Sequence, residues 1–97
     1  MTSKQRAHLK SLATKLDTIL HVGKNEISDN LIKQADDALY VHELIKGCVQ
    51  DNSLYSAKEA AEEISKATSS EIVQTIGRRF ILYRYNPKKD THISLGK

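Results

Sequence analysis

The N-terminal segment of the chain carries apolar residues at the spacing of one helix face. Leu9, Leu12, Ala13 and Leu16 stand at i, i+3, i+4 and i+7. Thr2 and Gln5 precede this stripe at the spacing of a capping box, in which each residue satisfies a free N–H of the other. A first helix that begins at Thr2 and carries a basic outer face is therefore predicted.

Two further helices are indicated by capping residues ahead of apolar stripes. Ser28 or Asp29 can cap a second helix, which should end near His42. Ser56 and Glu59 repeat the capping-box spacing, and small apolar residues follow them at helical intervals. This third helix has little apolar bulk, so we expect it to pack closely.

Short β-favouring runs separate these helices and follow the last one. The predicted strands are residues 18–22, 44–49, 72–76 and 79–84. Gly77 and Arg78 join the last two strands, and a two-residue connection with glycine first is typical of a type II′ hairpin. Gly47 lies inside the second strand, where a glycine often marks close packing.

The order of these elements predicts an α/β fold of the two-layer sandwich type. The order is α-β-α-β-α-β-β, in which strands separated by helices usually run parallel and the final hairpin is antiparallel. The sheet should therefore be mixed and four-stranded. With 97 residues in all, we expect one domain over residues 1–85 and a basic tail over residues 86–97.

Charge is distributed unevenly along the chain, although its formal net value is only +3. Residues 1–24 hold five Lys or Arg and one acid, residues 25–76 hold four Lys and ten acids, and residues 77–97 hold six bases and one acid. If the fold brings the two basic ends together, one face would attract a polyanion. Ordinary solvated surfaces are the alternative explanation.

Gly23 and Lys24 lie in a loop between a predicted strand and a predicted helix. Free backbone N–H groups and the positive end of the helix dipole favour an anion at such a place, and Lys24 adds a full charge. A phosphate of nucleic acid would suit it, since KH-type domains hold RNA backbone with a related glycine loop. A simple turn is the alternative.

Other function classes find little support in the residues. The longest apolar run is residues 80–83, far below the ~20 residues of a membrane-spanning helix. The polar N-terminus lacks the pattern of a secretory signal, so we expect a cytoplasmic protein that begins near Met1. Cys48 is the only cysteine, which excludes an internal disulfide and suggests a small buried side chain. The four histidines are scattered, and we expect no metal, cofactor or catalytic activity.

Taken together, several segments resemble the CRM domain family (chloroplast RNA splicing and ribosome maturation), particularly its stand-alone bacterial YhbY-like members. The matching segments are residues 4–13, 22–25, 42–46, 76–78 and 81–84, in the family's order and spacing. The resemblance implies the fold of the C-terminal domain of translation initiation factor three. It also implies an RNA-binding protein that associates with precursors of the large ribosomal subunit and assists ribosome assembly.

The resemblance assigns RNA contact to Gly23, Lys24 and Asn25 in the loop. Glu26 stands where the family loop has its second glycine, which places a negative charge near the expected phosphate. We therefore expect RNA contact through this loop to be weaker or shifted toward Lys24. Glu26 would in return stabilise the N-terminus of the second helix.

Further RNA contacts are expected from basic residues of both chain ends. They are Lys4, Arg6, Lys10, Arg78, Arg79 and Arg84. Lys46 is a weaker candidate, and Tyr83 and Tyr85 could stack on bases or simply cover the sheet. We expect a monomer whose partner is rRNA, without a membrane or a small-molecule substrate. A module that docks on a ribosomal protein without touching RNA remains the alternative.

Overall fold

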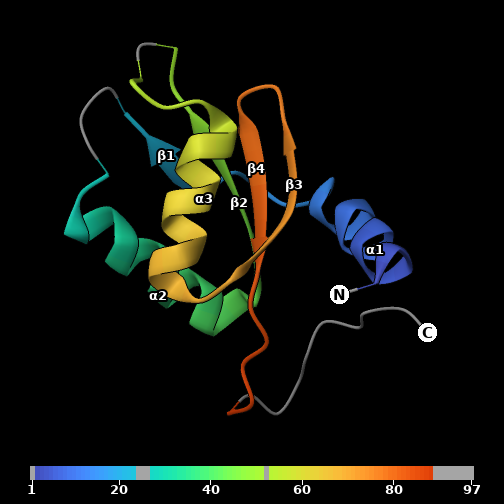
Figure 1. Ribbon diagram of the computed structural model, residues 1–97. Coiled ribbons are helices and arrows are strands. Elements are labelled where there is room, and N and C mark those ends of the chain that lie inside the picture. The colour runs from blue at the N-terminus through green and yellow to red at the C-terminus, as the bar shows by residue number, and fades with distance from the viewer. Residues whose placement is uncertain (1, 24–26, 52, 89–97) are drawn as a thin grey trace.

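A computed structural model of the chain describes residues 2–23, 27–51 and 53–88 (Figure 1). Its elements are α1 (Ser3–Ala13), β1 (Leu20–Val22), α2 (Asp29–His42), β2 (Leu44–Val49), α3 (Ala57–Thr68), β3 (Glu71–Ile76) and β4 (Arg79–Tyr83). The predicted α/β sandwich, with its order α-β-α-β-α-β-β and a mixed four-stranded sheet, is confirmed.

The helices begin where the capping residues predict. The Thr2 hydroxyl accepts a hydrogen bond from the Gln5 N–H at 3.1 Å, and the Gln5 side chain accepts one from the Thr2 N–H at 3.0 Å. Ser56 and Glu59 form the same reciprocal pair at the start of α3, with distances of 3.1 and 2.9 Å. Ser28 caps α2 by accepting from the Leu31 N–H. Local sequence thus determines where each helix starts.

The end of α1 comes earlier than the apolar stripe suggests. The helix stops at Ala13, and Leu16 lies beyond it in a turn. The ammonium group of Lys46, on β2, donates to the carbonyl oxygens of Ala13 at 3.4 Å and Leu16 at 3.5 Å. The Ala13 carbonyl also accepts from the Leu16 N–H at 3.1 Å, so Lys46 is a second donor to it, and a cation is favoured at that end of the dipole.

The strand order in the sheet is β1-β2-β4-β3. β1 and β2 pair in parallel through the α2 crossover, and β4 runs antiparallel to both of its neighbours. β2 and β3 are separated by a helix and run in the same direction, yet β4 lies between them. The first strand is shorter than predicted, and Gly77 adopts a φ of 56°, as the first position of a type II′ turn requires.

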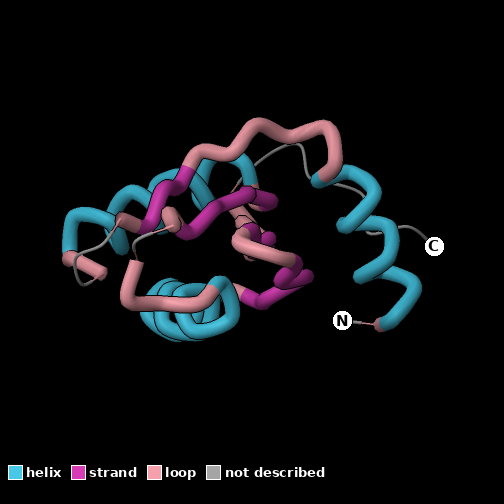
Figure 2. Tube along the Cα trace, turned by 90° about the horizontal axis from the view of Figure 1, so that it is seen from above, coloured by secondary structure: helices cyan, strands magenta, loops and turns pink. Residues whose placement is uncertain are grey.

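Each face of the sheet carries its own apolar cluster. α2 and α3 pack against one face, where Leu39, Ile64 and Phe80 are fully buried. α1 packs on the opposite face, as Figure 2 shows, and buries Leu9 and Ala13 there. Strand residues of this second cluster are Leu44, Val73, Ile81 and Tyr83. Because α1 is short, it covers only part of its face.

Gly47 marks a close contact, as its position inside a strand suggested. It pairs with Phe80 across β2 and β4. A Cβ atom added at Gly47 would lie 2.3 Å from Cζ of the Phe80 ring. The aromatic ring therefore occupies the space above the glycine, and any side chain at this position would displace it.

The chain remains packed beyond the last strand. The Asn86 N–H donates to Oε2 of the fully buried Glu43 at 2.7 Å, and the Asn86 side chain donates to the Tyr40 carbonyl at 2.8 Å. Residues 89–97 of the predicted tail lie outside the described part of the chain. Over the described residues, no helix has the length and apolar character needed to traverse a bilayer.

Candidate nucleic-acid interface

Three loops begin at the same end of the sheet. They follow β1, follow β2 and join β3 to β4 (Figure 1). The Gln50 N–H donates to the Val22 carbonyl at 2.9 Å, and the Val49 N–H donates to the Arg78 carbonyl at 2.7 Å. Gly23 therefore begins its loop at the same end as the Gly77–Arg78 hairpin. Lys24, Asn25 and Glu26 lie outside the residues that the structure describes.

On the face that carries α1, side chains form three transverse rows across the strands. The row nearest the three loops is His21, Cys48, Arg79 and Ile76, the next is Lys46, Ile81 and Gln74, and the last is Leu44, Tyr83 and Glu71. Leu44 and Tyr83 of the last row are buried in the apolar cluster beneath α1, whereas Arg79 and Ile76 of the first row are exposed. We call the first row the open row.

Cys48 corrects one prediction. It was expected to be buried, but it is half-exposed in the open row, where its sulfur lies 3.4 Å from Nδ1 of His21. Alternation along β2 explains this placement, since Gly47 and Val49 take the positions that face the main core.

A groove runs between α1 and the sheet, next to the open row. Its lining, which we call the α1 groove, is Lys10, Ala13, Thr14, Lys46, Gln74, Ile76, Arg79 and Ile81. Cationic side chains come to it from three separate elements, α1, β2 and β4. Those of Lys10 and Arg79 have no hydrogen bond or ion pair with any described residue, so both can meet an external anion. The two basic ends of the chain thus converge here.

A second hollow lies on the other side of Arg79, beside the loops. Arg78 and Arg79 line it together with His21, Cys48 and Asp51. The guanidinium of Arg78 forms an ion pair with Asp51 of the turn after β2. Because both side chains are largely exposed, such a pair contributes only ~0–1 kcal/mol to stability. Arg78 can therefore exchange this partner for a phosphate at little cost.

The same sequence matches the family model of the CRS1/YhbY (CRM) domain over residues 1–84. The chain belongs to the CRM domain family. That match spans every helix and strand described above, including both sides of the α1 groove.

Relatives of this CRM domain carry names that refer to RNA binding. The chain is 40% identical over 95 residues to the probable RNA-binding protein YqeI of Bacillus subtilis, covering 98% of each chain. It is 32% identical to an RNA-binding protein of Haemophilus influenzae, covering 98% of this chain and 94% of that one. A solution structure of the hypothetical protein SAV1595 from Staphylococcus aureus, described as a candidate RNA-binding protein, matches with a TM-score of 0.81. Its sequence is 45% identical, and 99% of each chain is covered.

Besides Arg78, two more of the predicted RNA-binding arginines have internal partners in this CRM domain. The Arg6 guanidinium donates to the main-chain carbonyls of Ile72 and Val73, where β3 is irregular. It thereby fastens α1 to the sheet.

Arg84 lies beyond the opposite end of β4 from Arg79. Its Nη1 contacts a carboxylate oxygen of Asp36 at 2.6 Å and the Thr68 carbonyl at 2.8 Å, which ties the end of β4 to α2 and α3. The Arg84 side chain is 22% exposed. The structure therefore separates Arg6 and Arg84, with internal partners, from Lys10 and Arg79 in the α1 groove. Lys4 is exposed near the start of α1, outside the groove lining.

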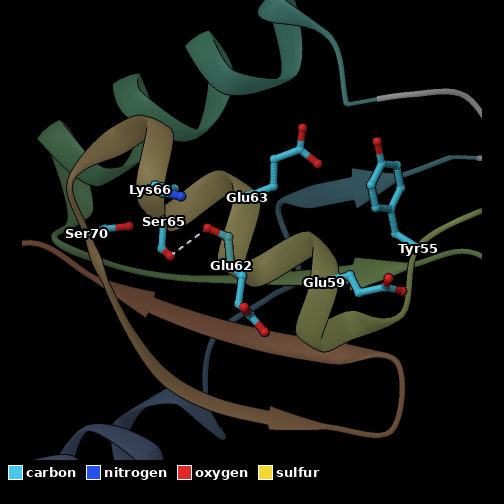
Figure 3. A pocket seen from close by; sticks show the side chains of 7 residues that line it. All are labelled: Tyr55, Glu59, Glu62, Glu63, Ser65, Lys66 and Ser70. Carbon is cyan, nitrogen blue, oxygen red and sulfur yellow. Dashed lines mark hydrogen bonds between the residues drawn. The ribbon is translucent and has the colours of Figure 1, made fainter.

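Acidic residues gather on α3, which covers the other face of the sheet. A shallow hollow there is lined by Tyr55, Glu59, Glu62, Glu63, Ser65, Lys66 and Ser70 (Figure 3). Figure 3 shows Glu62 and Glu63 pointing to different sides of the helix, so their carboxylates do not converge. Glu59 accepts the Ser56 N–H, and this bond lowers the pKa of its carboxyl. Among the described residues, no three His, Cys, Asp or Glu side chains are grouped to hold a metal ion.

Three residues of this surface escaped the sequence analysis. Gln74, Ile76 and His21 join the basic side chains only because of the strand order. Alternation along each strand does place them opposite the main core, and that pattern was the available signal. It could not show which strands are neighbours.

Proposed function

We propose that this protein binds RNA through the α1 groove, the open row and the loop that begins at Gly23. We further propose that its ligand is rRNA of the large-subunit precursor, and that it assists ribosome assembly. The names of its CRM relatives support RNA as the ligand class. The observation that carries the proposal is the meeting in one groove of Lys10 and Arg79, whose cationic groups have no partner among the described residues. Lys46, whose ammonium group donates to the Ala13 and Leu16 carbonyls, adds its charge there.

The arrangement of charge suits a polyanion that approaches from one side. Cations of α1, β2 and β4 line one face of the sheet, whereas the acidic side chains of α3 lie over the other. Phosphates would release condensed counterions when they contact these cations, which gives favourable free energy that depends on salt. The acidic face would repel RNA and so fix the orientation of binding.

The loop would extend this surface toward the start of α2. In our proposal Gly23, Lys24 and Asn25 contact the phosphate backbone beside the hairpin arginines Arg78 and Arg79. Gly23 lies at the end of the sheet to which the hairpin also belongs. A continuous RNA strand could therefore pass from the loop to the α1 groove along the open row.

Binding of purified large-subunit precursor rRNA, followed by fluorescence anisotropy over a salt series, tests the proposal. The logarithm of affinity should fall linearly with the logarithm of salt concentration. Arg79→Gln should weaken binding by about 1.5 kcal/mol, or about tenfold in Kd, and lower the salt slope by about one unit. Lys58→Gln, the same charge change on an exposed residue of α3, is the matched control and should leave Kd within about twofold.

Two results would contradict the proposal. Equal losses for Arg79→Gln and Lys58→Gln would mean that net charge, and not this surface, determines binding. Failure to bind naked rRNA at low salt would favour the alternative, a module that docks on a ribosomal protein. Crosslinking in cells tests the identity of the ligand, because attached reads should concentrate in large-subunit precursor rRNA.

A further inference from the structure

The α1 groove combines an apolar surface with a size below that of a drug-sized ligand site. Its volume is about 260 Å³, and pockets for drug-sized ligands begin at roughly 300 Å³. Ala13 is fully buried and Ile81 is 5% exposed beneath the groove, whereas Ile76, 62% exposed, supplies the apolar side chain that a ligand can reach. A flat, partly apolar group of the size of one nucleobase would cover this surface. A double helix would not enter it.

The rim of the groove is polar and lacks negative charge. Lys10, Lys46 and Arg79 contribute cations, and Asp or Glu side chains are missing from the described lining. The side-chain amide of Gln74 makes no hydrogen bond with any described residue. An amide offers both a donor and an acceptor, which matches the mixed hydrogen-bonding edge of a base.

We propose that the α1 groove receives one unpaired nucleotide of the bound RNA. The base packs against Ile76 above the buried Ala13 and Ile81, its edge meets the Gln74 amide, and its phosphate lies against the cationic rim. This inference rests on the proposed RNA-binding function and adds the class of RNA. The preferred ligand is a stem with a bulged or looped-out nucleotide, and not an uninterrupted duplex.

The energetics favour a nucleotide that is already unpaired. Extruding a paired base costs a few kcal/mol of lost stacking and pairing, whereas a bulged base has lost its pairing beforehand. An A-form duplex instead offers a shallow minor groove with hydroxyl and phosphate groups, which would touch the rim cations and leave the apolar side chain of Ile76 uncovered. The same cations would thus bind both RNAs, and only Ile76 and Gln74 would distinguish them.

Two hairpin RNAs of equal length and charge test the inference with the full-length chain. One carries 2-aminopurine as a single-nucleotide bulge, and the other carries it paired within a continuous stem. The bulged RNA should bind at least about tenfold more tightly, equivalent to about 1.4 kcal/mol. Its 2-aminopurine emission should rise on binding, because the base leaves the stack for a groove without aromatic side chains among its described lining.

The Gln74→Ala variant tests whether the preference for the bulged RNA comes from this groove. The variant should lose most of the preference for the bulged RNA while binding the paired RNA as before. Gln34→Ala, at an exposed position on α2, is the matched control and should change neither affinity. Thermal midpoints of both variants near that of the wild type would show that the fold is intact.

The possible failures separate this inference from the proposed function. Equal affinity for both RNAs without an emission change overturns the unpaired-nucleotide site but leaves RNA binding in place. A bulge preference that Gln74→Ala does not reduce overturns the assignment to the α1 groove. Absence of binding to either RNA at low salt overturns the proposed function itself.

Discussion

The substitution Gly47→Ala should destabilise the domain through a clash with a single aromatic ring. The new methyl group would lie 2.3, 2.6 and 3.0 Å from three ring atoms of Phe80, and ordinary contacts begin at 3.4 Å. The ring would have to retreat by about 1 Å, yet Phe80 is fully buried among side chains that include Leu39 and Ile64. Such overpacking typically costs ~1–3 kcal/mol.

Part of this cost would be offset in the unfolded state. Alanine loses less backbone entropy than glycine on folding, which contributes roughly 0.5–1 kcal/mol in the opposite direction. The middle values of the two ranges, about 2 and about 0.75 kcal/mol, leave a net loss of about 1.3 kcal/mol. In a domain of this size, the loss corresponds to a fall of roughly 5–10 °C in the thermal midpoint.

Chemical denaturation of a double-mutant cycle measures the clash itself. Phe80→Leu alone should destabilise the protein by leaving a cavity. In the Gly47→Ala background the same change should cost less, because it removes the ring atoms that the methyl group meets. The coupling energy should be at least about 0.5 kcal/mol. Strictly additive effects, or an unchanged stability of Gly47→Ala, would refute the reasoning.

Two further predictions concern Arg84 and Tyr83. Arg84→Met should lower the free energy of unfolding by about 1–2 kcal/mol, because the Asp36 and Thr68 oxygens lose their donor, while RNA affinity measured by anisotropy stays the same. A lower RNA affinity at unchanged stability would show instead that Arg84 contacts RNA. Tyr83→Phe should be neutral or stabilising in denaturant titrations, because the Tyr83 hydroxyl is buried without a hydrogen-bond partner in the described structure. Burial, followed by the charge of Glu43, raises the pKa of Tyr83 above its ordinary value of 10.0, so wild-type stability should fall as pH rises above about 10, and Tyr83→Phe should reduce that fall.

Hydrogen bonds between residues close in the sequence made the helix starts predictable from the sequence alone. The reciprocal caps at Thr2 and Ser56 involve residues three positions apart, so the sequence contains both partners side by side. The second strand and the second helix also lie where the short apolar run and the capping residues placed them. By contrast, the contact between Lys46 and the end of α1 joins residues 33 positions apart, which no local pattern connects.

The candidate site could be predicted only in part from the sequence, because its residues are brought together by contacts between distant parts of the chain. Arg6 and Arg79 look alike in the sequence, but Arg6 is held by carbonyls 66 and 67 positions away. Gln74 enters the α1 groove because β4 is inserted between β2 and β3, and strand order cannot be derived from periodicity. The charge distribution indicated one basic face only on the condition that the fold brings the two ends together. It could not show which cations would remain available.

The hydrogen bonds from Arg6 to β3 also affect how readily the protein could associate with other copies of itself. β3 is an outer strand of the sheet, and exposed main-chain groups of such strands can template pairing with another copy. The irregularity between Ile72 and Gln74 bends this edge strand. The Arg6 guanidinium also donates hydrogen bonds to two of its carbonyl oxygens. The other border, β1, offers only three residues. Arg6 therefore reduces the number of free acceptors along the β3 edge, which should make strand pairing with another copy less favourable.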